Sequence, residues 1–537
     1  MRVADVYFIA FYLILTIIVF FPIVTKIDTA IIGGGDDAYG TLWNIWWIRK
    51  ATSEGRNIFY TDYMYYPKGT HLYFSVLSMF NAFIASMLSF FISYIASYNI
   101  LMLSTYVLSG YFMFLLVNYL VKDRRIALIA GVVYAFSPYH LSHTLGHLNL
   151  ASIQWIPLYT LFLLKGLKGK GRKGFVYIAL AGVVLAITGL SDWQYLYFSL
   201  LFTFLLSLFL LFDKSIKLGR VFVLKVALLI SVLLILISPF AYPMFAEYLS
   251  KDYMKVKSVA EMKSYVSPLN YFIPNAFSFI HTTLLYKLFQ DYSIRADESV
   301  VSLGCTLILL SILTIRKTYK KVKIWLISFV FFFLLSLNPV FVVNQHQIIS
   351  PLHQVLYALP FFNAIKIMNR AAVFVMFSMT IIFSYSLKEL LPKNKLLPVI
   401  FVLALIFFEF IPYRFPSSPV EIPSGILELE SSDIRYSVMN IPSHFGYPMF
   451  MQTLHKHKMI DGYVARVDPQ SLEIINQLRE NVNNSAALTN TIRSVNLKYI
   501  LIYYEKEPSQ LLELLDKIPN KVISRDRGLE IREILID

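Results

Sequence analysis

The chain has 537 residues, of which 57% are hydrophobic and only 15% are charged, and its mean hydropathy is +0.60. Because soluble domains are typically about 25% charged and about 45–50% apolar, this composition excludes a soluble globular protein and a disordered chain. Lys and Arg exceed Asp and Glu by 48 to 33, which gives a net charge of +15. The basic residues form short clusters between apolar runs, which is typical of topology anchors in a membrane protein and not of nucleic-acid binding.

Apolar runs of roughly the length needed to cross a bilayer recur along the first 413 residues. The run 74–97 is interrupted by serine and asparagine, so we expect it to lie on the membrane surface or to re-enter it. The prediction is therefore an α-helical polytopic membrane protein with about 11 to 12 transmembrane helices. The expected runs are 5–25, 74–97, 99–121, 126–139, 151–167, 175–190, 193–212, 221–243, 299–315, 324–343, 373–391 and 396–413.

The connectors between these runs predict the orientation of the chain. Cytoplasmic connectors carry an excess of Lys and Arg, and this bias assigns the basic connectors to the cytoplasm. With about eleven crossings, everything after residue 413 is then expected outside the cytoplasm. The basic connectors are 122–125, 165–173, 214–220, 316–323 and 388–395, and the expected external connectors are 33–71, 139–150, 189–193, 245–298 and 344–370.

Beyond residue 413 the charged residues return, and three prolines between 416 and 423 mark a linker. We therefore expect two domains, a membrane domain over 1–413 and a small extracytoplasmic α/β domain over 414–537. Within the second domain the pattern predicts strands, helices and a closing hairpin. The strands are 436–441 and 498–504, the helices are 469–480 and 509–518, and the hairpin joins 522–524 to 529–534.

The first expected external loop contains an acidic pair. Residues 33–40 read GGGDDAYG, and Trp43, Trp46 and Trp47 follow. Two adjacent carboxylates, Asp36 and Asp37, suit a general base or a cation ligand next to a membrane. The alternative is a solvated loop whose tryptophans form an aromatic belt at the membrane interface.

The layout of the chain resembles the GT-C superfamily of polytopic glycosyltransferases. The resemblance rests on one crossing, an external loop with an acidic pair, YYPKG at 65–69, and SPY at 137–139 opening a second external loop. The second loop, SPYHLSHTLGHLN at 137–149, is similar to the equivalent loop of oligosaccharyltransferase catalytic subunits. Those subunits carry an acidic metal-binding motif where this chain has His147, Leu148 and Asn149, which leaves metal dependence open. Their Trp-Trp-Asp-Tyr-Gly signature does not occur in 414–537.

Three histidines in the second loop are spaced by three and four residues, so on a helix they would share one face. They are His140, His143 and His147. In one interpretation the three imidazoles form hydrogen bonds to the backbone or to water at a polar, membrane-adjacent helix. In the alternatives they contact a phosphate or bind a metal ion.

Three further charged residues lie next to the ends of apolar runs. Asp192 separates two runs, and it is either a turn residue or a group facing a polar cavity. Arg370 begins another run, where it either clamps a lipid phosphate or extends to the interface. Glu298 closes the long loop together with Arg295 and Asp297. The resemblance implies that an acidic residue near the end of such a loop helps to bind metal or substrate.

The resemblance implies a cell-membrane enzyme that moves a sugar from a polyprenyl-phosphate donor to an extracytoplasmic glycan, lipid or protein, with inversion. Asp36 or Asp37 would remove the proton of the acceptor hydroxyl. The sequence identifies no cofactor with certainty, and a divalent cation, Mg or Mn, is the candidate. Two other functions stay open, a lipid or glycan transporter or flippase and a non-catalytic assembly protein with this fold. The expected substrate-binding residues are His140, His143, His147, Asp192, Glu298 and Arg370.

Overall fold

The computed structural model divides the chain into two compact units, and each is described by itself. Unit 1 comprises Met1–Thr25 and Ile100–Pro416, and unit 2 comprises Lys26–Asn99 and Ser417–Asp537. Residues 26–99 thus pack with the C-terminal part of the chain, while the assignment of 1–413 to the membrane and of 414–537 to the extracytoplasmic side stays a prediction. The structure describes residues 3–73, 78–251, 255, 257–273, 298–343, 346–359, 362–392, 395–412, 414–443, 445–504 and 510–536.

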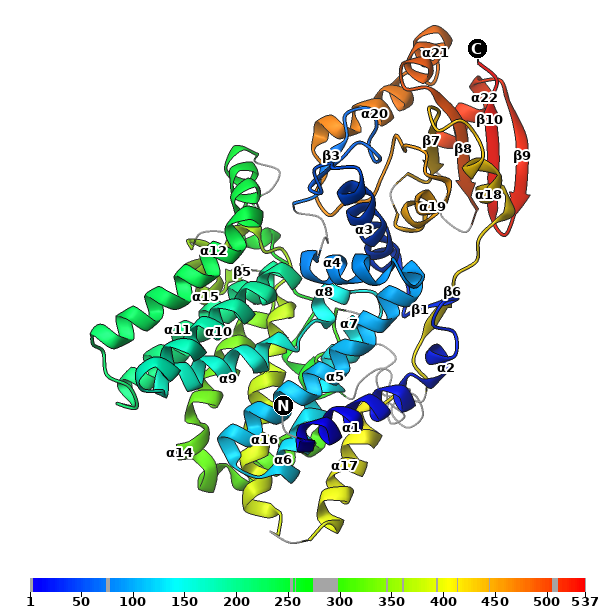
Figure 1. The fold of residues 1–537 in the computed structure, drawn as a ribbon. Coiled ribbons are helices and arrows are strands. Elements are labelled where there is room, and N and C mark those ends of the chain that lie inside the picture. Colours follow the sequence, from blue (N-terminus) through cyan, green and yellow to red (C-terminus); the bar gives the residue numbers. More distant parts are fainter. Residues whose placement is uncertain are drawn as a thin grey trace. The chain divides into compact units, whose positions relative to one another are not determined.

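Unit 1 is built from helices, together with one short β-hairpin (Figure 1). The hairpin pairs β4 (Val340–Val343) with β5 (His346–Ile349). Helix α5 starts in the last residues of the segment 26–99 and continues into this unit. The helices are α1 (Val3–Val19), α2 (Phe21–Val24), α5 (Tyr94–Val121), α6 (Arg124–Ala135), α7 (Pro138–His143), α8 (Leu148–Ala151), α9 (Trp155–Lys168), α10 (Gly171–Ser191), α11 (Trp193–Phe212), α12 (Arg220–Ser250), α14 (Cys305–Ser336), α15 (Pro351–Tyr357), α16 (Ala372–Leu390) and α17 (Leu397–Phe410), with short 3₁₀ turns that include η6 (Asn369–Ala371).

Among the described residues, six helical segments are long and apolar enough to cross a membrane. The structure therefore supports a polytopic membrane protein without reproducing the expected number of crossings. Helix α4 (Met79–Leu88), within the expected run 74–97, has ten residues and is about 15 Å long, shorter than the roughly 30 Å hydrocarbon core. The six segments are Tyr94–Val121, Leu148–Lys168, Gly171–Ser191, Trp193–Phe212, Arg220–Ser250 and Asn369–Leu390.

The predicted runs 299–315 and 324–343, with a connector at 316–323, coincide with one helical segment of 32 residues, α14 (Cys305–Ser336). Both ends of α14 approach Tyr271, because the N–H of Leu303 donates to the Tyr271 carbonyl at 3.0 Å and the Tyr271 hydroxyl lies 2.5 Å from the Ser336 hydroxyl. A straight helix of this length would extend about 48 Å, so α14 reverses its direction between its ends. The ion pairs of Lys321 and Lys323 lie at the opposite end of unit 1, which agrees with two antiparallel runs joined at 316–323.

The basic segments meet at one end of unit 1. Lys323 Nζ lies 2.6 Å from Asp213 at the end of α11, and Lys321 Nζ lies 3.0 Å from Glu389 at the end of α16. Arg125 Nη1 donates to the carbonyl of Pro392 at 3.1 Å. Helix α16 runs from this end to Arg370, a length of about 28 Å for its 19 residues, so Arg370 lies at the opposite end of the bundle.

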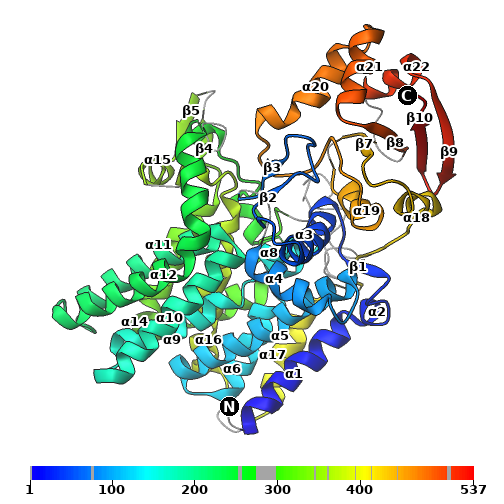
Figure 2. The same ribbon diagram turned by 45° about the horizontal axis from the view of Figure 1, so that its top comes forward.

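Unit 2 contains a four-stranded sheet with the strand order β7-β8-β10-β9. Strand β7 (Ser437–Ile441) runs parallel to β8 (Leu497–Tyr503), and β10 (Leu529–Ile534) is antiparallel to β8 and to β9 (Asn520–Asp526). The predicted strands and the closing hairpin are confirmed. The other helices, labelled in Figure 2, are α18 (Ser424–Glu430), α19 (Tyr447–His455), α20 (Glu473–Glu480), α21 (Ser485–Ser494) and α22 (Leu514–Lys517). Two 3₁₀ turns, η7 (Pro469–Leu472) and η8 (Gln510–Glu513), precede α20 and α22.

The segment expected to be a loop, 33–71, contains an 18-residue helix, α3 (Asp36–Ser53). Its tryptophans at 43, 46 and 47 are buried in the core of unit 2 against Met449, Met459 and Val464, so they form no aromatic belt. Trp43 Nε1 donates to Gln452 Oε1 at 2.6 Å. Strand β1 (Ala30–Ile32) pairs with β6 (Ser417–Pro419), and β2 (Tyr60–Thr61) pairs with β3 (Thr70–His71).

Candidate functional site

The acidic pair opens helix α3 in unit 2. Gly35 precedes it with a φ of 83°, a left-handed conformation that glycine adopts without steric cost. Asp36 Oδ1 accepts a hydrogen bond from the backbone N–H of Gly446 at 3.0 Å. A Cβ on Gly446 would lie 2.1 Å from the carbonyl oxygen of Asp36, so this close approach of two backbones requires glycine.

Asp37 has a different partner. Its Oδ1 accepts a hydrogen bond from the Tyr463 hydroxyl at 3.2 Å. Burial, followed by the negative charges of Asp37 and Asp36, raises the pKa of Tyr463, so the phenol stays protonated and donates. The N-terminus of α3 also favours negative charge at both carboxylates. The two acids therefore differ in their surroundings, as two groups with separate tasks would.

A second cluster lies in unit 1, around Glu298 and Arg370. Arg370 Nη2 and Nε donate to Glu298 Oε1 at 2.7 Å and 3.2 Å. Asn369 Nδ2 donates to Glu298 Oε2 at 2.9 Å. Burial by itself raises the pKa of Glu298, but the adjacent Arg370 charge outweighs burial, and the resulting pKa is about 2.

Asp192 joins α10 to α11 and caps the N-terminus of α11. Its Oδ1 accepts from the backbone N–H groups of Gln194 at 2.9 Å and Tyr195 at 3.0 Å, and its Oδ2 accepts from Asn149 Nδ2 at 2.8 Å. Burial raises the pKa of Asp192, and the charge of Arg370 acts against this increase. The residue is therefore both a helix cap and a buried acid within the electrostatic reach of Arg370.

Two buried tyrosines connect these groups. The Tyr139 hydroxyl donates to the carbonyl of Arg370 at 3.1 Å and lies 2.8 Å from the Tyr195 hydroxyl. The Tyr195 hydroxyl donates to the carbonyl of Leu150 at 2.7 Å. Helices α7 and α11 and the start of α16 are thus held together by one hydrogen-bonded chain.

The three predicted histidines do not share one environment. His140 is buried, with Nδ1 2.6 Å from the carbonyl of Ala135 and Nε2 2.9 Å from the Thr105 hydroxyl. Because a carbonyl only accepts, Nδ1 carries the proton, and both ring nitrogens are used within the protein. Burial lowers the pKa of His140 to about 3, so the ring is neutral.

His143 and His147 instead lie within the electrostatic reach of Glu298. Their rings lie 5.7 Å apart, and the His143 ring packs edge-on against Tyr139 at 4.4 Å. Burial lowers the pKa of His143 to about 3, although Glu298 acts against this decrease. His143 Nδ1 is buried without a hydrogen-bond partner among the described residues, as is Oδ1 of Asn149 and of Asn369. Such atoms are expected where a polar ligand binds.

The sequence interpretation missed several residues of both clusters. Asn149 is the last residue of the second loop motif, and Asn369 directly precedes Arg370. Both asparagines could therefore have been predicted as site residues from their position next to predicted ones. Tyr463 and Gly446 lie more than 400 residues from the acidic pair, and nothing local in the sequence connects them. Arg295 and Asp297, expected beside Glu298, lie outside the described residues.

Within the part of the chain that the structure describes, no three His, Cys, Asp or Glu side chains are grouped so that they could hold a metal ion. One oxygen of each acid in the pair already accepts a protein hydrogen bond. The divalent cation stays a prediction of the sequence.

No family model and no curated protein match the sequence. Solved structures do resemble the fold. Arabinofuranosyltransferase AftD from mycobacteria is 12% identical and has a TM-score of 0.61, over 99% of this chain and 40% of that chain. The archaeal oligosaccharyltransferase AglB from Archaeoglobus fulgidus was solved with an inhibitory peptide and a dolichol-phosphate. It is 12% identical and has a TM-score of 0.51, over 100% of this chain and 74% of that chain.

A structure of the Archaeoglobus fulgidus oligosaccharyltransferase with Zn and sulfate is 13% identical and has a TM-score of 0.51, over 93% of this chain and 68% of that chain. The chain spans about two fifths of the length of AftD. At these identities the similarity concerns the fold. The chain therefore shares its fold with AftD and with the archaeal oligosaccharyltransferase AglB, which agrees with the layout expected from its sequence.

Proposed function

We propose that the protein is a membrane glycosyltransferase that moves one sugar from a polyprenyl-phosphate donor to an acceptor hydroxyl on the extracytoplasmic side, with inversion. The observation that carries the proposal is the GT-C fold over essentially the whole chain, shared with an arabinofuranosyltransferase and with an oligosaccharyltransferase solved with dolichol-phosphate. A lipid-linked donor has to be met at membrane depth, and helices that end in a polar cluster supply a site for its head group.

In this proposal the acidic pair performs the proton transfer. One carboxylate of Asp36 and Asp37 accepts the proton of the acceptor hydroxyl while the hydroxyl oxygen attacks the anomeric carbon. The bond from that carbon to the phosphate oxygen breaks, and polyprenyl phosphate leaves with the electron pair. The other carboxylate positions the first, because two acids with different partners divide the work.

Arg370 is the group we propose for the departing phosphate. A guanidinium has five N–H donors, and two of them donate to Glu298. The remaining donors have no acceptor among the described residues, while the pair with Glu298 fixes the plane of the guanidinium. His143, whose Nδ1 has no hydrogen-bond partner in the described part of the chain, is the second polar group that we assign to the phosphate. Both stabilise the negative charge that develops on the phosphate.

The test is transfer by the purified full-length protein from radiolabelled polyprenyl-phosphate sugars to a mixture of membrane lipid and glycan acceptors. We expect labelled product with the wild type and loss of product with Asp36→Asn and Asp37→Asn together. Asp433→Asn is the matched control, because Asp433 is an exposed acid of the same unit. A labelled donor that stays intact with every acceptor, or is only moved between leaflets of a vesicle, would refute the proposal and favour a flippase.

A further inference from the structure

A tyrosine hydroxyl that the proposed mechanism does not use lies within the electrostatic reach of Asp37. It belongs to Tyr98, near the start of α5, and the charge of Asp37 acts on it. The Tyr98 side chain is fully buried, and its hydroxyl has no hydrogen-bond partner in the part of the chain that the structure describes. Tyr463, by comparison, donates its hydroxyl to Asp37 Oδ1 at 3.2 Å.

Asn99 follows directly in the chain and ties the start of α5 to the strand before the acidic pair. Its Oδ1 accepts from the backbone N–H of Ile32 at 3.0 Å. Its Nδ2 donates to the carbonyls of Ala30 at 2.7 Å and Ile27 at 2.9 Å. Strand β1 leads through the three glycines into the acidic pair. These hydrogen bonds place the start of α5 beside the backbone that carries the two carboxylates.

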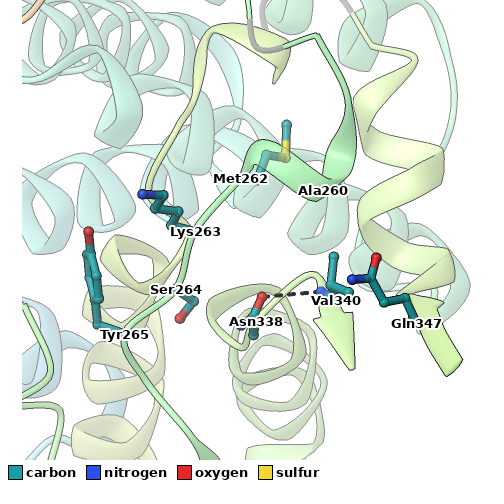
Figure 3. A pocket seen from close by; sticks show the side chains of 8 residues that line it. All are labelled: Ala260, Met262, Lys263, Ser264, Tyr265, Asn338, Val340 and Gln347. Carbon is teal, nitrogen blue, oxygen red and sulfur yellow. Dashed lines mark hydrogen bonds between the residues drawn. The ribbon is translucent and has the colours of Figure 1, made fainter. Parts of the chain in front are cut away.

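A buried hydroxyl without a partner differs from an exposed polar group, as a pocket in unit 1 illustrates. Figure 3 shows this pocket, of about 380 Å³, between the segment from Ala260 to Tyr265 and Asn338, Val340 and Gln347. Asn338 Oδ1 accepts from the Val340 N–H at 3.2 Å, and the amides of Asn338 and Gln347 are exposed, so solvent can satisfy them. The Tyr98 hydroxyl is closed to solvent, and leaving such a group unpaired costs free energy. A ligand is therefore indicated at Tyr98 and not at the exposed amides.

The group that fits between Tyr98 and Asp37 is a hydroxyl. A phenol near a carboxylate turns its O–H toward the negative charge, so a group between them accepts from the phenol. The same group has to donate to the carboxylate. A hydroxyl does both, whereas a phosphate or carbonyl oxygen only accepts and an ammonium only donates. The charge of Asp37 also repels a phosphate.

We propose that Tyr98 is a further catalytic residue, whose hydroxyl donates a hydrogen bond to the oxygen of the acceptor hydroxyl that gives its proton to Asp37. This assignment rests on the proposed function. The acceptor oxygen accepts from Tyr98 with one lone pair and attacks the anomeric carbon with the other, while its proton passes to Asp37. Asp37 is then the base, and Asp36, which is bonded to the Gly446 N–H, is the positioning acid. Tyr463 holds the base and Tyr98 holds the acceptor, so the two phenols orient both partners of the proton transfer.

The experiment compares Tyr98→Phe, which removes one oxygen atom, with two other tyrosine variants of unit 2. Tyr65→Phe removes a buried hydroxyl that donates to the carbonyl of Gly462 at 2.8 Å, and Tyr504→Phe removes an exposed hydroxyl. Thermal unfolding of the purified full-length proteins is measured in detergent. Transfer from a radiolabelled polyprenyl-phosphate sugar is measured while the total concentration of the lipid and glycan acceptor mixture is varied, and then while the donor is varied.

We expect Tyr98→Phe to lower kcat/KM for the acceptors about two- to tenfold, which corresponds to the loss of one neutral hydrogen bond. Donor saturation and the melting temperature should stay as in the wild type, because the variant loses no hydrogen bond within the protein. Tyr65→Phe should lower the melting temperature, since it leaves a buried carbonyl unpaired. Tyr504→Phe should leave transfer unchanged.

Wild-type acceptor kinetics in Tyr98→Phe would overturn the proposal, and so would an effect on donor saturation in place of acceptor saturation. A fall in melting temperature as large as that of Tyr65→Phe would also overturn it, because the hydroxyl would then have a partner within the protein. Failure of the proposed function has a different signature, since the wild type itself would then form no labelled product.

Discussion

The guanidinium of Arg370 donates two hydrogen bonds to one oxygen of Glu298, from Nη2 at 2.7 Å and from Nε at 3.2 Å. The neighbouring Asn369 donates to the other oxygen at 2.9 Å. Two adjacent residues of η6, directly before α16, thus bond to a buried carboxylate 71 and 72 residues earlier in the chain. The arrangement fixes the direction of the guanidinium, which a side chain extending freely to the membrane interface would not show.

Arg370→Lys should reduce sugar transfer by about tenfold although it preserves the charge. An ammonium cannot present the planar fork that bonds Glu298 and still faces a phosphate. Transfer rates at several donor concentrations measure the effect. Arg125→Lys, at the opposite end of the bundle, is the control and should be silent. Unchanged donor saturation and turnover in Arg370→Lys would make Arg370 a structural residue only.

Glu298→Gln should destabilise unit 1 by about 3–5 kcal/mol at neutral pH, because it leaves the buried charge of Arg370 without its counterion. The pKa of Glu298 is lowered to about 2, below its ordinary value of 4.5. The stabilisation is therefore fully present above about pH 4.5 and is lost as the pH falls toward 2. Thermal unfolding of both proteins in detergent between pH 7 and pH 3 checks this. Parallel curves for wild type and variant would contradict the assignment.

Asp36→Asn and Asp37→Asn should have unequal effects on turnover. Replacing the base should cost on the order of a hundredfold or more, since general base catalysis typically contributes about that much. Replacing the positioning acid should cost less, and Tyr463→Phe should resemble a mild form of Asp37→Asn because it removes only the hydrogen bond to Asp37. Single-turnover rates with saturating donor separate the three variants. Near-normal transfer by both Asn variants would place the base elsewhere.

Asp461 should make unit 2 less stable as the pH rises. It is buried, and its two oxygens accept from the backbone N–H of Asn440 at 2.5 Å and from Asn440 Nδ2 at 2.8 Å. Burial raises the pKa of Asp461 to about 7. Because the folded pKa lies above the unfolded value of about 3.9, the contribution of Asp461 to the stability of unit 2 is fully present below about pH 3.9. This contribution is lost as the pH rises to about 7. Melting temperatures between pH 4 and 8 should fall in the wild type and fall less in Asp461→Asn.

The segment 33–71, which contains the acidic pair and helix α3, and the C-terminal part of the chain should face the same, non-cytoplasmic side. Single cysteines at the exposed residues Ser53 and Ser485 test this in a Cys305→Ser background, since Cys305 is itself exposed. A third cysteine at Ser215, in a basic connector, is the opposite-side reference. A membrane-impermeant thiol reagent applied to sealed cells should label the first two sites only. Labelling of Ser53 and Ser485 from opposite sides would refute the topology.

The sequence by itself determined the class of the protein, the strands of the C-terminal sheet and the GT-C layout. Composition and short-range periodicity carry this information, because burial in lipid and alternation in a strand are properties of consecutive residues. The same local rules led to an error over 33–71. They placed the tryptophans at 43, 46 and 47 in a loop, although their spacing is that of one helix face and they are buried in the core of unit 2.

Only the tertiary structure decided which candidate residues belong together. It paired Glu298 with Arg370, placed His143 and His147 beside them, and enclosed His140 between Ala135 and Thr105. Three histidines with nearly equal spacing thus received two different environments, because Thr105 and Ala135 of other helices hold the His140 ring, whereas the His143 ring packs against Tyr139 and His147. Hydrogen bonds across tens to hundreds of residues depend on how helices pack, and neither hydropathy nor helical period specifies that packing.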